Sequence, residues 1–412
     1  MILNDMKTAE QALSKFVRPV SKNYNLDAIR ALLVELGNPQ DSLRVVHVAG
    51  TSGKTSTSYY AAALIASTGH SVGLSVSPHI DTVRERTQVN GGLIEESKYL
   101  ILLGEFLDIV AETGIDVSYF ELLVAFSYWV WAKLGLEYAV VEVGLGGLLD
   151  GTNVVTRSDK ICIITDIGYD HQDVLGETLP EIAAQKAGII LPNNSVFMYE
   201  QSREVMDVVR SIASEKAAIV VVVPDATVSG AEHLSLFQKR NSSLAYAAVQ
   251  ALGIQGFGVK EATSITVPGR MERQIVDGIP VFLDGSHNGQ KIGALVESFR
   301  EKYPGLQPVL VVSFGKNRSD AMREGLQLLR VLGDRIIATN FTSQQDMHHE
   351  SLAPAEIAER AKNAGFKEII EVPGTLAAVQ YALSLKPDAV LLVGSFYALL
   401  EVRSALEIIQ EN

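Results

Sequence analysis

Residues 43–57 read Leu-Arg-Val-Val-His-Val-Ala-Gly-Thr-Ser-Gly-Lys-Thr-Ser-Thr, and this stretch decides the fold of the first part of the chain. An apolar, β-branched run ends at Ala49, a glycine-flanked turn runs from Gly50 to Gly53, and a helical pattern opens at Lys54. Such a loop turns its backbone N–H groups inward, and the helix N-terminus adds partial positive charge. The stretch predicts a phosphate-binding loop in which Lys54 reaches the outer phosphates.

The loop is shorter than the common phosphate loop, whose spacing is G-x-x-x-x-G-K-[ST]. The position of the first glycine of that pattern is Val48, inside the expected strand. The shorter form, G-x-x-G-K-T-S, consists of Gly50, Thr51, Ser52, Gly53, Lys54, Thr55 and Ser56. The alternative is a Gly-Ser-Thr turn with one solvated lysine. The strand before the loop and the helix after it favour phosphate binding, with the hydroxyls that follow the lysine available to phosphate or Mg²⁺.

Composition limits the classes of protein to which the chain can belong. Its 412 residues suggest two or three domains, and its net charge of −13 argues against a nucleic-acid or membrane-surface partner. The lone Cys162 excludes an intrachain disulfide and a cysteine-rich metal site, and it is expected to be a buried structural thiol. Residues 1–17 lack a secretory apolar region, and no apolar run approaches the roughly 20 residues of a membrane helix. We expect a soluble, cytoplasmic protein.

Strand and helix patterns alternate along the chain, which predicts an α/β fold. Before the pattern changes near Pro268-Gly269-Arg270, the expected strands are 71–75, 138–143 and 161–166, and the expected helices are 95–112, 119–134 and 179–188. Beyond it, strands 279–283, 308–313, 335–340, 367–370 and 389–393 alternate with helices 320–332, 353–364, 375–386 and 396–410. The chain is therefore divided into an N-terminal phosphate-loop domain with a mostly parallel sheet, residues 1–272, and a C-terminal α/β domain with a second parallel sheet and flanking helices, residues 273–412.

Polar side chains follow several first-domain strands. Ser77, Glu142 and His171 come at or after strand ends, where ligands of open α/β sheets collect, so they can converge beside the phosphate loop. Ser77 and Glu142 suit Mg²⁺ at ATP phosphates, whereas His171 suits a second metal or contact with the reacting group. Taken singly, each has a structural explanation as a turn cap, a solvated acid or a helix cap. Lys186 lies on an otherwise apolar helix, and its spacing favours a packed stem with its amine in water.

Short motifs run in a specific order and spacing along nearly the whole chain. They are Leu36-Gly37-Asn38-Pro39, Ser77-Pro78-His79, Arg84-Glu85-Arg86, Ser118-Tyr119-Phe120-Glu121, Glu142-Val143-Gly144-Leu145-Gly146-Gly147, Asp170-His171, Ala187-Gly188-Ile189, Pro268-Gly269-Arg270, Asp284-Gly285-Ser286-His287-Asn288 and Gly394-Ser395-Phe396-Tyr397. Together they resemble the folylpolyglutamate synthase and dihydrofolate synthase branch of the Mur ligase superfamily.

The resemblance implies an ATPase domain, a Rossmann-like domain and an active site between them. It implies ATP-dependent amide formation, in which the γ-phosphoryl group activates a carboxylate and the α-amine of L-glutamate attacks the acyl phosphate. The implied acceptor is dihydropteroate, tetrahydrofolate or both. Small molecules are then the expected partners, with no nucleic acid or membrane, and we expect a monomer.

The resemblance also assigns roles to residues. The loop from Gly50 to Ser56 would hold the phosphates, with further ATP contacts from Asn241, Arg270 and Asp284. Ser77 and Glu142 would bind the first Mg²⁺, and His171 the second, together with Lys186, whose amine would carry a CO₂-derived carbamate. The pterin side would be Ser118, Tyr119, Phe120, Glu121, Asp150 and Gly151. His287 and Ser395 would face the incoming glutamate. The implied catalytic set is Lys54, His171, Lys186 and His287.

The sequence departs from the family pattern at several positions. Ser52 stands where the family usually has asparagine, Thr55 where it has glycine, Leu148 where it has arginine, Gly151 where it has alanine and Gly289 where it has proline. Thr55 and Leu148 motivate an alternative, a Mur-like ligase with another carboxylate acceptor. A second alternative is an ATP-binding relative that has lost catalysis.

Overall fold

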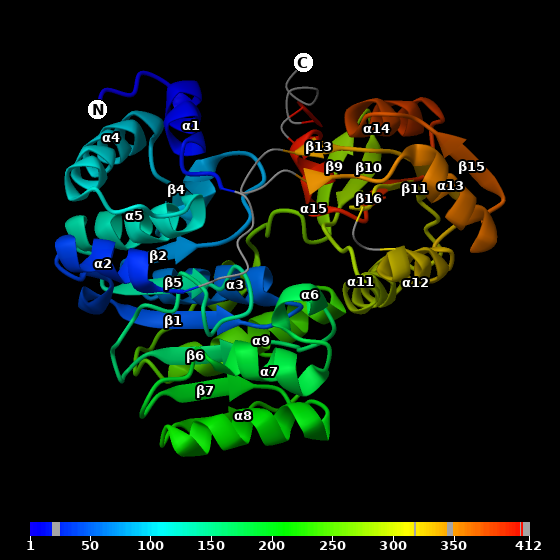
Figure 1. Cartoon of the computed structure of the whole chain (residues 1–412). Helices are drawn as coiled ribbons and strands as arrows, with labels where there is room; N and C mark the ends of the chain where they lie inside the picture. Colours follow the sequence, from blue (N-terminus) through cyan, green and yellow to red (C-terminus); the bar gives the residue numbers. More distant parts are fainter. Residues whose placement is uncertain (19–24, 317–318, 344–348, 404, 407–412) are drawn as a thin grey trace. The chain divides into compact units, whose positions relative to one another are not determined.

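The computed structural model describes residues 1–18, 25–316, 319–343, 349–403 and 405–406, and the chain divides into two compact units. Unit 1 comprises Met1–Leu234 and Gln238–Ile265, and unit 2 comprises Ser235–Phe237 and Thr266–Asn412 (Figure 1). Each unit is built on its own mixed, mostly parallel sheet. The predicted α/β fold is confirmed.

The sheet of unit 1 places the strand before the phosphate loop near its middle. The strands are β1 (Arg44–Ala49), β2 (Val72–Ser75), β3 (Gln88–Val89), β4 (Gly92–Leu93), β5 (Tyr138–Glu142), β6 (Ile161–Ile164), β7 (Ser195–Met198) and β8 (Ile219–Val222). Their order is β4-β3-β2-β5-β1-β6-β7-β8. Strands β2, β5, β1, β6, β7 and β8 run parallel, and β3 and β4 add an antiparallel edge. The carboxyl ends of β2, β5, β1 and β6 therefore lie at one edge.

The helices of unit 1 pack on this sheet or on one another. They are α1 (Met6–Ser14), α2 (Asp27–Glu35), α3 (Lys54–Ser67), α4 (Glu96–Thr113), α5 (Tyr119–Lys133), α6 (Gln172–Leu175), α7 (Leu179–Ala187), α8 (Arg203–Glu215), α9 (Leu236–Gln250) and α10 (Val259–Thr263), with 3₁₀ turns at Pro39–Ser42 and Val83–Arg86. Side chains alternate across a strand, so Val45, His47 and Ala49 of β1 share one face. Val45 packs with α2, α4 and α5, and Ala49 packs with α7 and α8. These helices therefore cover the face to which His47 points.

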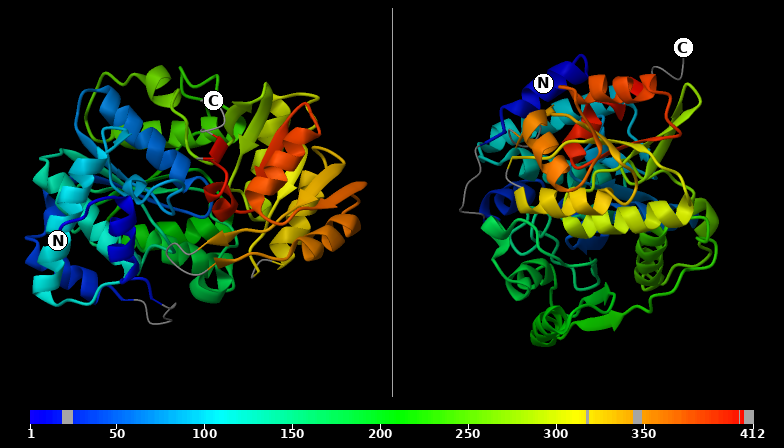
Figure 2. Two further views of the ribbon diagram at one scale, coloured as in Figure 1. Left: turned by 90° about the horizontal axis from the view of Figure 1, so that it is seen from above. Right: turned by 90° about the vertical axis from the view of Figure 1, so that its right-hand side faces the viewer.

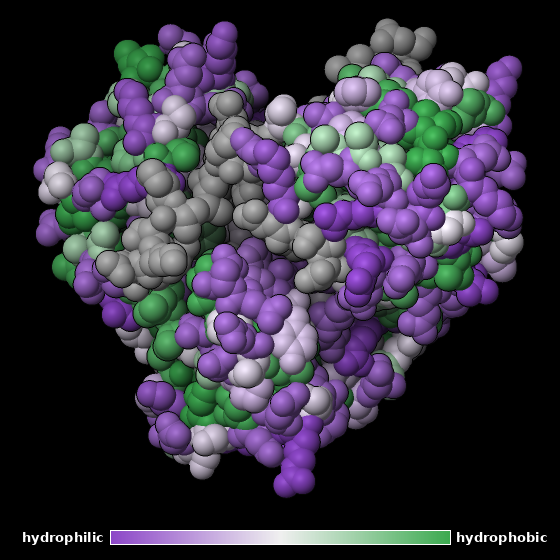
Figure 3. Space-filling model, turned by 45° about the vertical axis from the view of Figure 1, so that its right-hand side comes forward, coloured by the Kyte–Doolittle hydropathy of each residue, from purple (hydrophilic) through white to green (hydrophobic). Residues whose placement is uncertain are grey.

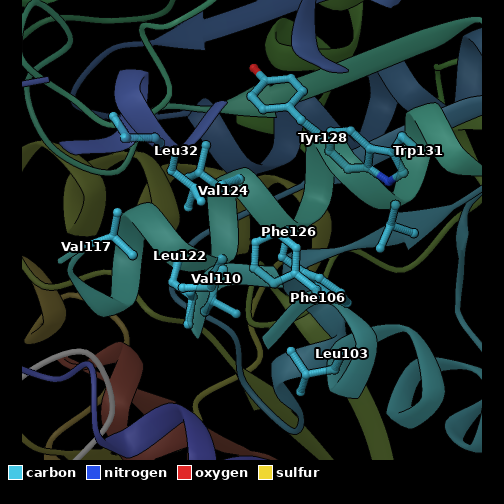
Figure 4. Close-up of a cluster of buried hydrophobic side chains, with 14 of the residues drawn as sticks. Leu32, Leu103, Phe106, Val110, Val117, Leu122, Val124, Phe126, Tyr128 and Trp131 are labelled. Atoms are coloured by element: carbon cyan, nitrogen blue, oxygen red, sulfur yellow. The ribbon is translucent and has the colours of Figure 1, made fainter. Parts of the chain in front are cut away.

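The core beneath α4 and α5 is rich in aromatic rings. On α4, Phe106 is fully buried, and its ring centroid lies 5.2 Å from that of Phe126 on α5 (Figure 4). Trp131 is also fully buried, and its indole N–H donates to the carbonyl of Gln88 at 3.0 Å. The polar end of the indole is thus satisfied while its ring fills the core.

Unit 2 has the second sheet, in the order β15-β12-β11-β16-β10-β9. The strands are β9 (Glu272–Val276), β10 (Ile279–Leu283), β11 (Val309–Val312), β12 (Arg335–Ala338), β15 (Glu368–Glu371) and β16 (Val390–Val393), with a separate pair β13 (Thr342–Ser343) and β14 (His349–Glu350). The helices are α11 (Gly289–Lys302), α12 (Ser319–Leu329), α13 (Pro354–Asn363), α14 (Thr375–Ser384) and α15 (Phe396–Leu400). Helices α11 and α12 lie side by side, and with α13 they bury Phe282, Leu310 and Leu391 of the sheet (Figures 1 and 2).

Most expected elements are present, and two expectations for unit 2 were incomplete. Strand β9 was not expected; it pairs antiparallel with β10 through a tight turn at Asp277 and Gly278, which have φ of 50° and 79°. Positive φ at both positions is typical of a hairpin turn. The helix expected at 396–410 is interrupted: α15 ends at Leu400, a turn follows at Glu401 and Val402, and Arg403, Ala405 and Leu406 are helical again. Positions 404 and 407–410 of that expectation lie outside the described residues.

The described part of the chain contains no helix that is both long enough and apolar enough to cross a bilayer. On the face drawn in Figure 3, hydrophilic side chains cover most of the surface and hydrophobic ones gather in smaller areas between them. At the edge of the unit 1 sheet, β8 leaves Ile219, Val221 and Val222 exposed.

We predict that Phe106→Ala lowers the free energy of unfolding of unit 1 by about 3–5 kcal/mol, because it opens a cavity in the aromatic core. Ile101→Ala on the same helix is the control, since Ile101 is 70% exposed, and it should change the value by less than about 0.5 kcal/mol. Both tryptophans, Trp129 and Trp131, lie on α5, so tryptophan fluorescence during urea unfolding reports on this core. Equal losses of unfolding free energy in the two variants would contradict the assignment of Phe106 to the aromatic core.

Candidate active site

The phosphate loop connects β1 to α3 and is held by the segment that follows β6. Gly53 caps α3 with φ of 92°, and Gly50 has φ of 148° and leaves no room for a side chain against Thr165. The N–H groups of Thr51 and Ser52 donate to the carbonyl of Asp166 at 2.9 and 3.1 Å. The loop conformation therefore depends on glycine at two positions and on the neighbouring strand end.

Three residues predicted to contact ATP, Thr51, Lys54 and Asn241, have side chains at the loop. The amine of Lys54 donates to the Gly50 carbonyl at 3.1 Å. Asn241 of α9 lies against Gly53, since a Cβ at that position would come 2.6 Å from its Oδ1. The hydroxyl of Thr51 exchanges hydrogen bonds with the backbone of Gly168 at 3.0 and 3.1 Å. The ends of β1 and β6 and the helix α9 thus meet at the loop.

Glu142 is the last residue of β5 and is buried beside the loop. Its Oε1 accepts the hydroxyl of Thr55 at 2.9 Å, and its Oε2 accepts the N–H of Ser77 at 3.3 Å. The structure therefore brings together Thr55, Ser77 and Glu142, as the order of β2, β5 and β1 predicts. Its burial excludes the alternative that Glu142 is a solvated loop acid.

The donor chemistry here fits a hard divalent cation. Glu142 offers a buried carboxylate, and Thr55 and Ser77 offer hydroxyls. Within the described ranges, no group of three or more His, Cys, Asp or Glu side chains is arranged to hold a metal ion. A cation at Glu142 would therefore take few protein ligands and complete its shell from phosphate oxygens and water, which is the usual manner of Mg²⁺.

Lys186 does not extend into water, so the interpretation from spacing alone was wrong. The residue is only 3% exposed, and its amine donates to the carbonyl of Gly50 in the phosphate loop at 2.9 Å.

His171 is the N-cap residue of α6 and has φ of 50°, and its side chain is 44% exposed. Its Nε2 lies 3.8 Å from Oδ1 of Asp170. The hydrogen bonds between Thr51 and Gly168 connect the segment that carries His171 to the phosphate loop.

Arg240 contributes to the site although sequence reasoning did not select it. Its guanidinium pairs with Asp166 at 2.9 Å and with Asp225 at 2.7 Å, and it stacks 3.8 Å above the ring of Tyr199. Burial raises the pKa of Tyr199 to about 12. The cluster borders a cavity of about 370 Å³ lined by Tyr199, Glu200, Val222, Val223, Pro224, Asp225 and Arg240. The position beside Asn241 was the only available signal in the sequence.

The two stretches expected to bind the pterin lie against each other. A Cβ at Gly144 would come 2.7 Å from the ring of Phe120, and one at Gly151 would come 3.3 Å from it. Ser118 and Glu121 instead form the N-terminal capping box of α5, in which the Ser118 hydroxyl donates to Glu121 at 2.6 Å. Phe120 therefore faces the acceptor loop, residues 144–153, while Ser118 and Glu121 hold the start of the helix; the neighbouring Tyr119 is buried.

Asp150 is buried inside the acceptor loop, and protein groups bind both of its carboxylate oxygens. Oδ2 accepts the N–H of Leu145 at 2.7 Å, and Oδ1 accepts the N–H and the hydroxyl of Thr152 at 3.0 and 2.5 Å. Burial raises the pKa of Asp150, and these hydrogen bonds oppose the rise. In this structure Asp150 organises the loop from within.

Unit 2 gathers its predicted residues at the ends of β10 and β16. Asp284 accepts the N–H groups of Met271 and Ser286 at 2.8 and 2.9 Å; burial raises its pKa, and the nearby Arg270 opposes the rise. Arg270 lies 5.2 Å from the ring of Phe396.

The remaining predicted residues of unit 2 lie on two neighbouring segments. The Nδ1 of His287 is 2.8 Å from the Gly285 carbonyl, and its Nε2 is 3.0 Å from the amine of Lys291, which was not predicted. The Ser395 side chain caps α15 by accepting the N–H of Tyr397 at 3.2 Å.

Comparison with known proteins decides the family. Residues 269–396 match the family model described as Mur ligase, glutamate ligase domain. The dihydrofolate synthetase of Saccharomyces cerevisiae is 28% identical over 90% of this chain and 95% of its own length. The dihydrofolate synthase/folylpolyglutamate synthase of Bacillus subtilis is 27% identical over 93% and 95%. The folylpolyglutamate synthase of Mycobacterium tuberculosis, solved with ADP and AMPPCP, superposes with a TM-score of 0.84 at 26% identity, over 97% of this chain and 98% of that one.

The chain belongs to the folylpolyglutamate synthase/dihydrofolate synthase family of the Mur ligase superfamily. Against the pattern of this family, the departures in the acceptor loop have local structural effects. Gly151 leaves room for the ring of Phe120, which an alanine would press. Leu148 is exposed. Because leucine is apolar, this position, where the family pattern has arginine, carries no charge here. The departure at Thr55 supplies the hydroxyl that binds Glu142.

We predict that Gly53→Ala weakens the binding of ADP at least about tenfold, because the new methyl group displaces Asn241 and strains the loop. Gly69→Ala is the control: Gly69 lies just after α3 with φ of 86° and has open space at its Cβ position. Both substitutions carry a similar backbone penalty of about 1–2 kcal/mol, but only Gly53→Ala changes the site. Isothermal titration with ADP measures the difference, and equal affinities of the two variants would contradict it.

Proposed function

We propose that this protein is an ATP-dependent ligase that joins L-glutamate to a folate-type carboxylate, with dihydropteroate, tetrahydrofolate or both as acceptor. The observation that carries the proposal is the buried Glu142, bonded to Thr55 of the phosphate loop and to Ser77 at the end of the next strand. The names of the full-length relatives support the acceptor class, because they are dihydrofolate and folylpolyglutamate synthases.

The phosphate loop would hold the triphosphate of ATP. Its N–H groups and the N-terminus of α3 offer partial positive charge, and Lys54 adds a full charge near the outer phosphates. Asn241 lies against the loop from α9, which suits a further contact with the nucleotide. Arg270 and Asp284 of unit 2 are proposed as the remaining ATP contacts. Catalysis of phosphoryl transfer needs mainly positioning and neutralised charge, and these groups supply both.

Glu142, Ser77 and Thr55 would hold the Mg²⁺ that accompanies ATP, since they are oxygen donors beside the loop. When bound, the cation neutralises charge on the β- and γ-phosphates. His171 and Lys186 are proposed for a second cation, with Lys186 carrying a carbamate. The position of Lys186 is compatible with this modification, because a carbamate keeps one N–H for the Gly50 carbonyl and adds two oxygen ligands.

The acceptor would lie against Phe120 and the acceptor loop. An aromatic face beside Gly144 and Gly151 suits a flat pterin ring. The γ-phosphoryl group passes from ATP to the acceptor carboxylate and leaves ADP; the α-amine of glutamate then displaces phosphate and loses a proton. The amide and inorganic phosphate are the products. His287 and Ser395 are proposed to bind the glutamate.

A second candidate function is a Mur-like ligase with a different carboxylate acceptor. The exposed Leu148 favours it, because the acceptor loop lacks the cation that the family pattern has at this position. A loop without that cation would recognise the acceptor by shape more than by charge. The two candidates share the ATP side and differ only in the acceptor.

Mass spectrometry of products tests both candidates and the alternative without catalysis. We expect that wild-type protein with ATP, Mg²⁺ and L-glutamate adds one or more glutamyl groups to dihydropteroate or tetrahydrofolate, offered separately. Glu142→Gln is the matched control; it keeps the size of the side chain but removes its charge and should reduce kcat about 100-fold or more. Turnover only with non-pterin carboxylates would support the second candidate. Binding of ATP without turnover of any acceptor would support an inactive relative.

We predict that Lys186→Ala loses turnover about 100-fold, because an anion near the phosphate loop is removed. Lys186→Glu, or short carboxylates added to the alanine variant, should restore part of kcat by replacing that anion. The assay is phosphate release with and without added formate or acetate. Near-native turnover of Lys186→Ala would contradict the carbamate.

A further inference from the structure

A line of buried polar side chains connects β1 to the acceptor loop. His47 lies in the middle of β1 and is fully buried, Thr152 is buried, and Asp150 is buried inside the loop. The Nε2 of His47 is 2.8 Å from the hydroxyl of Thr152, which is 2.5 Å from Oδ1 of Asp150. On the same face of β1, Val45 belongs to the apolar cluster under α5, and Ala49 belongs to the one under α7. His47 lies between them, so this polar line lies between two apolar cores.

The chemistry of the three groups settles which atom donates in each bond. The Thr152 hydroxyl has one proton, and a carboxylate can only accept, so Thr152 donates to Asp150. The same hydroxyl must then accept from His47, whose Nε2 carries the ring proton. The Nδ1 of His47 has no hydrogen-bond partner among the described residues. Burial, with a smaller effect from Lys160, lowers the pKa of His47 well below its usual range, which favours the neutral ring.

Asp150 passes this constraint to the rest of the loop. Its second oxygen binds the N–H of Leu145 at the start of the loop. Near the end of the loop, the Asn153 amide donates to the carbonyls of Leu148 and Gly188 at 3.1 and 3.0 Å. The loop is therefore fixed at several points, and its Gly144 and Gly151 are held against the ring of Phe120.

We propose that His47 and Thr152 are positioning residues for the acceptor, acting through Asp150 on the loop that faces Phe120. This inference rests on the proposed function and adds two residues to it. Neither residue needs to touch the acceptor or the nucleotide. Loss of the Thr152 hydroxyl leaves Asp150 with one fewer donor, and loss of the His47 ring leaves that hydroxyl without the donor that orients it. In either case the loop no longer has one preferred conformation.

Calorimetry on the full-length protein tests the role of Thr152. Thr152→Val keeps the shape of the side chain and removes the hydroxyl, whereas Thr152→Ser keeps the hydroxyl. We expect Thr152→Val to raise the Kd of dihydropteroate, or of tetrahydrofolate if that is the acceptor bound, about tenfold, while the Kd of ADP changes less than about twofold. Thr152→Ser should bind both like wild type. An unchanged acceptor Kd in Thr152→Val, or an equal weakening of ADP, overturns the proposal.

Variants of His47 test the other end of the line. The amide of Gln can replace the Nε2 donor, so His47→Gln should resemble wild type, and His47→Leu should resemble Thr152→Val. The double variant His47→Leu/Thr152→Val should bind the acceptor no worse than either single variant, because all three lose the same line. Additive losses contradict the inference.

A measurement that needs no substrate checks the hydrogen-bond directions. Nitrogen-15 NMR of the wild-type protein, with the His47 signal identified by its absence in His47→Gln, should show a protonated Nε2 and a bare Nδ1. A protonated Nδ1 with a bare Nε2 would contradict the hydrogen bond from His47 to Thr152 and overturn the proposal. If wild-type protein binds neither pterin compound, the proposed function fails; if it does bind and Thr152→Val binds equally well, only this inference fails.

Discussion

Parallel pairing of β1 with β5 on one side and β6 on the other is the constraint on which the site of unit 1 depends. Val48 lies in register with Glu142, and Ala49 with Ile164, so the chain leaves all three strands at one edge. A register slip of one residue would turn every side chain of a strand to the wrong face. The phosphate loop, the buried carboxylate and the carbonyl of Asp166 therefore depend on one set of backbone hydrogen bonds for their arrangement.

The periodicity of the sequence was sufficient for most elements and for the convergence of Thr55, Ser77 and Glu142, because strand ends of a parallel sheet must meet. The same periodicity does not show which polar side chains are buried. Lys186 lies on a short helix whose pattern is equally compatible with a snorkelling lysine, and only the packing of α7 against the loop shows that the amine is enclosed. Periodicity does not detect β9, because its pairing with β10 depends on the two-residue turn at Asp277 and Gly278.

A family motif marks a stretch of chain, but it does not separate a side chain that touches a ligand from one that holds its neighbours. Ser118 and Glu121 illustrate this, because they bond each other at the start of α5. Asp150 is similar, with both oxygens engaged by the loop. Arg240 shows the converse: no motif selected it, and the structure places it between Asp166 and Tyr199.

The acceptor loop and the helix that bears Lys186 are interlocked through backbone atoms. The Leu148 N–H donates to the Gln185 carbonyl at 2.8 Å, Gly147 packs against the same carbonyl, and Gly188 has no space for a side chain against Leu148. These contacts fix the two segments to each other. A redesign of this protein for another carboxylic acid would have to exchange residues 147–149 and 185–188 together. A change in either segment alone would disturb the burial of the Lys186 side chain.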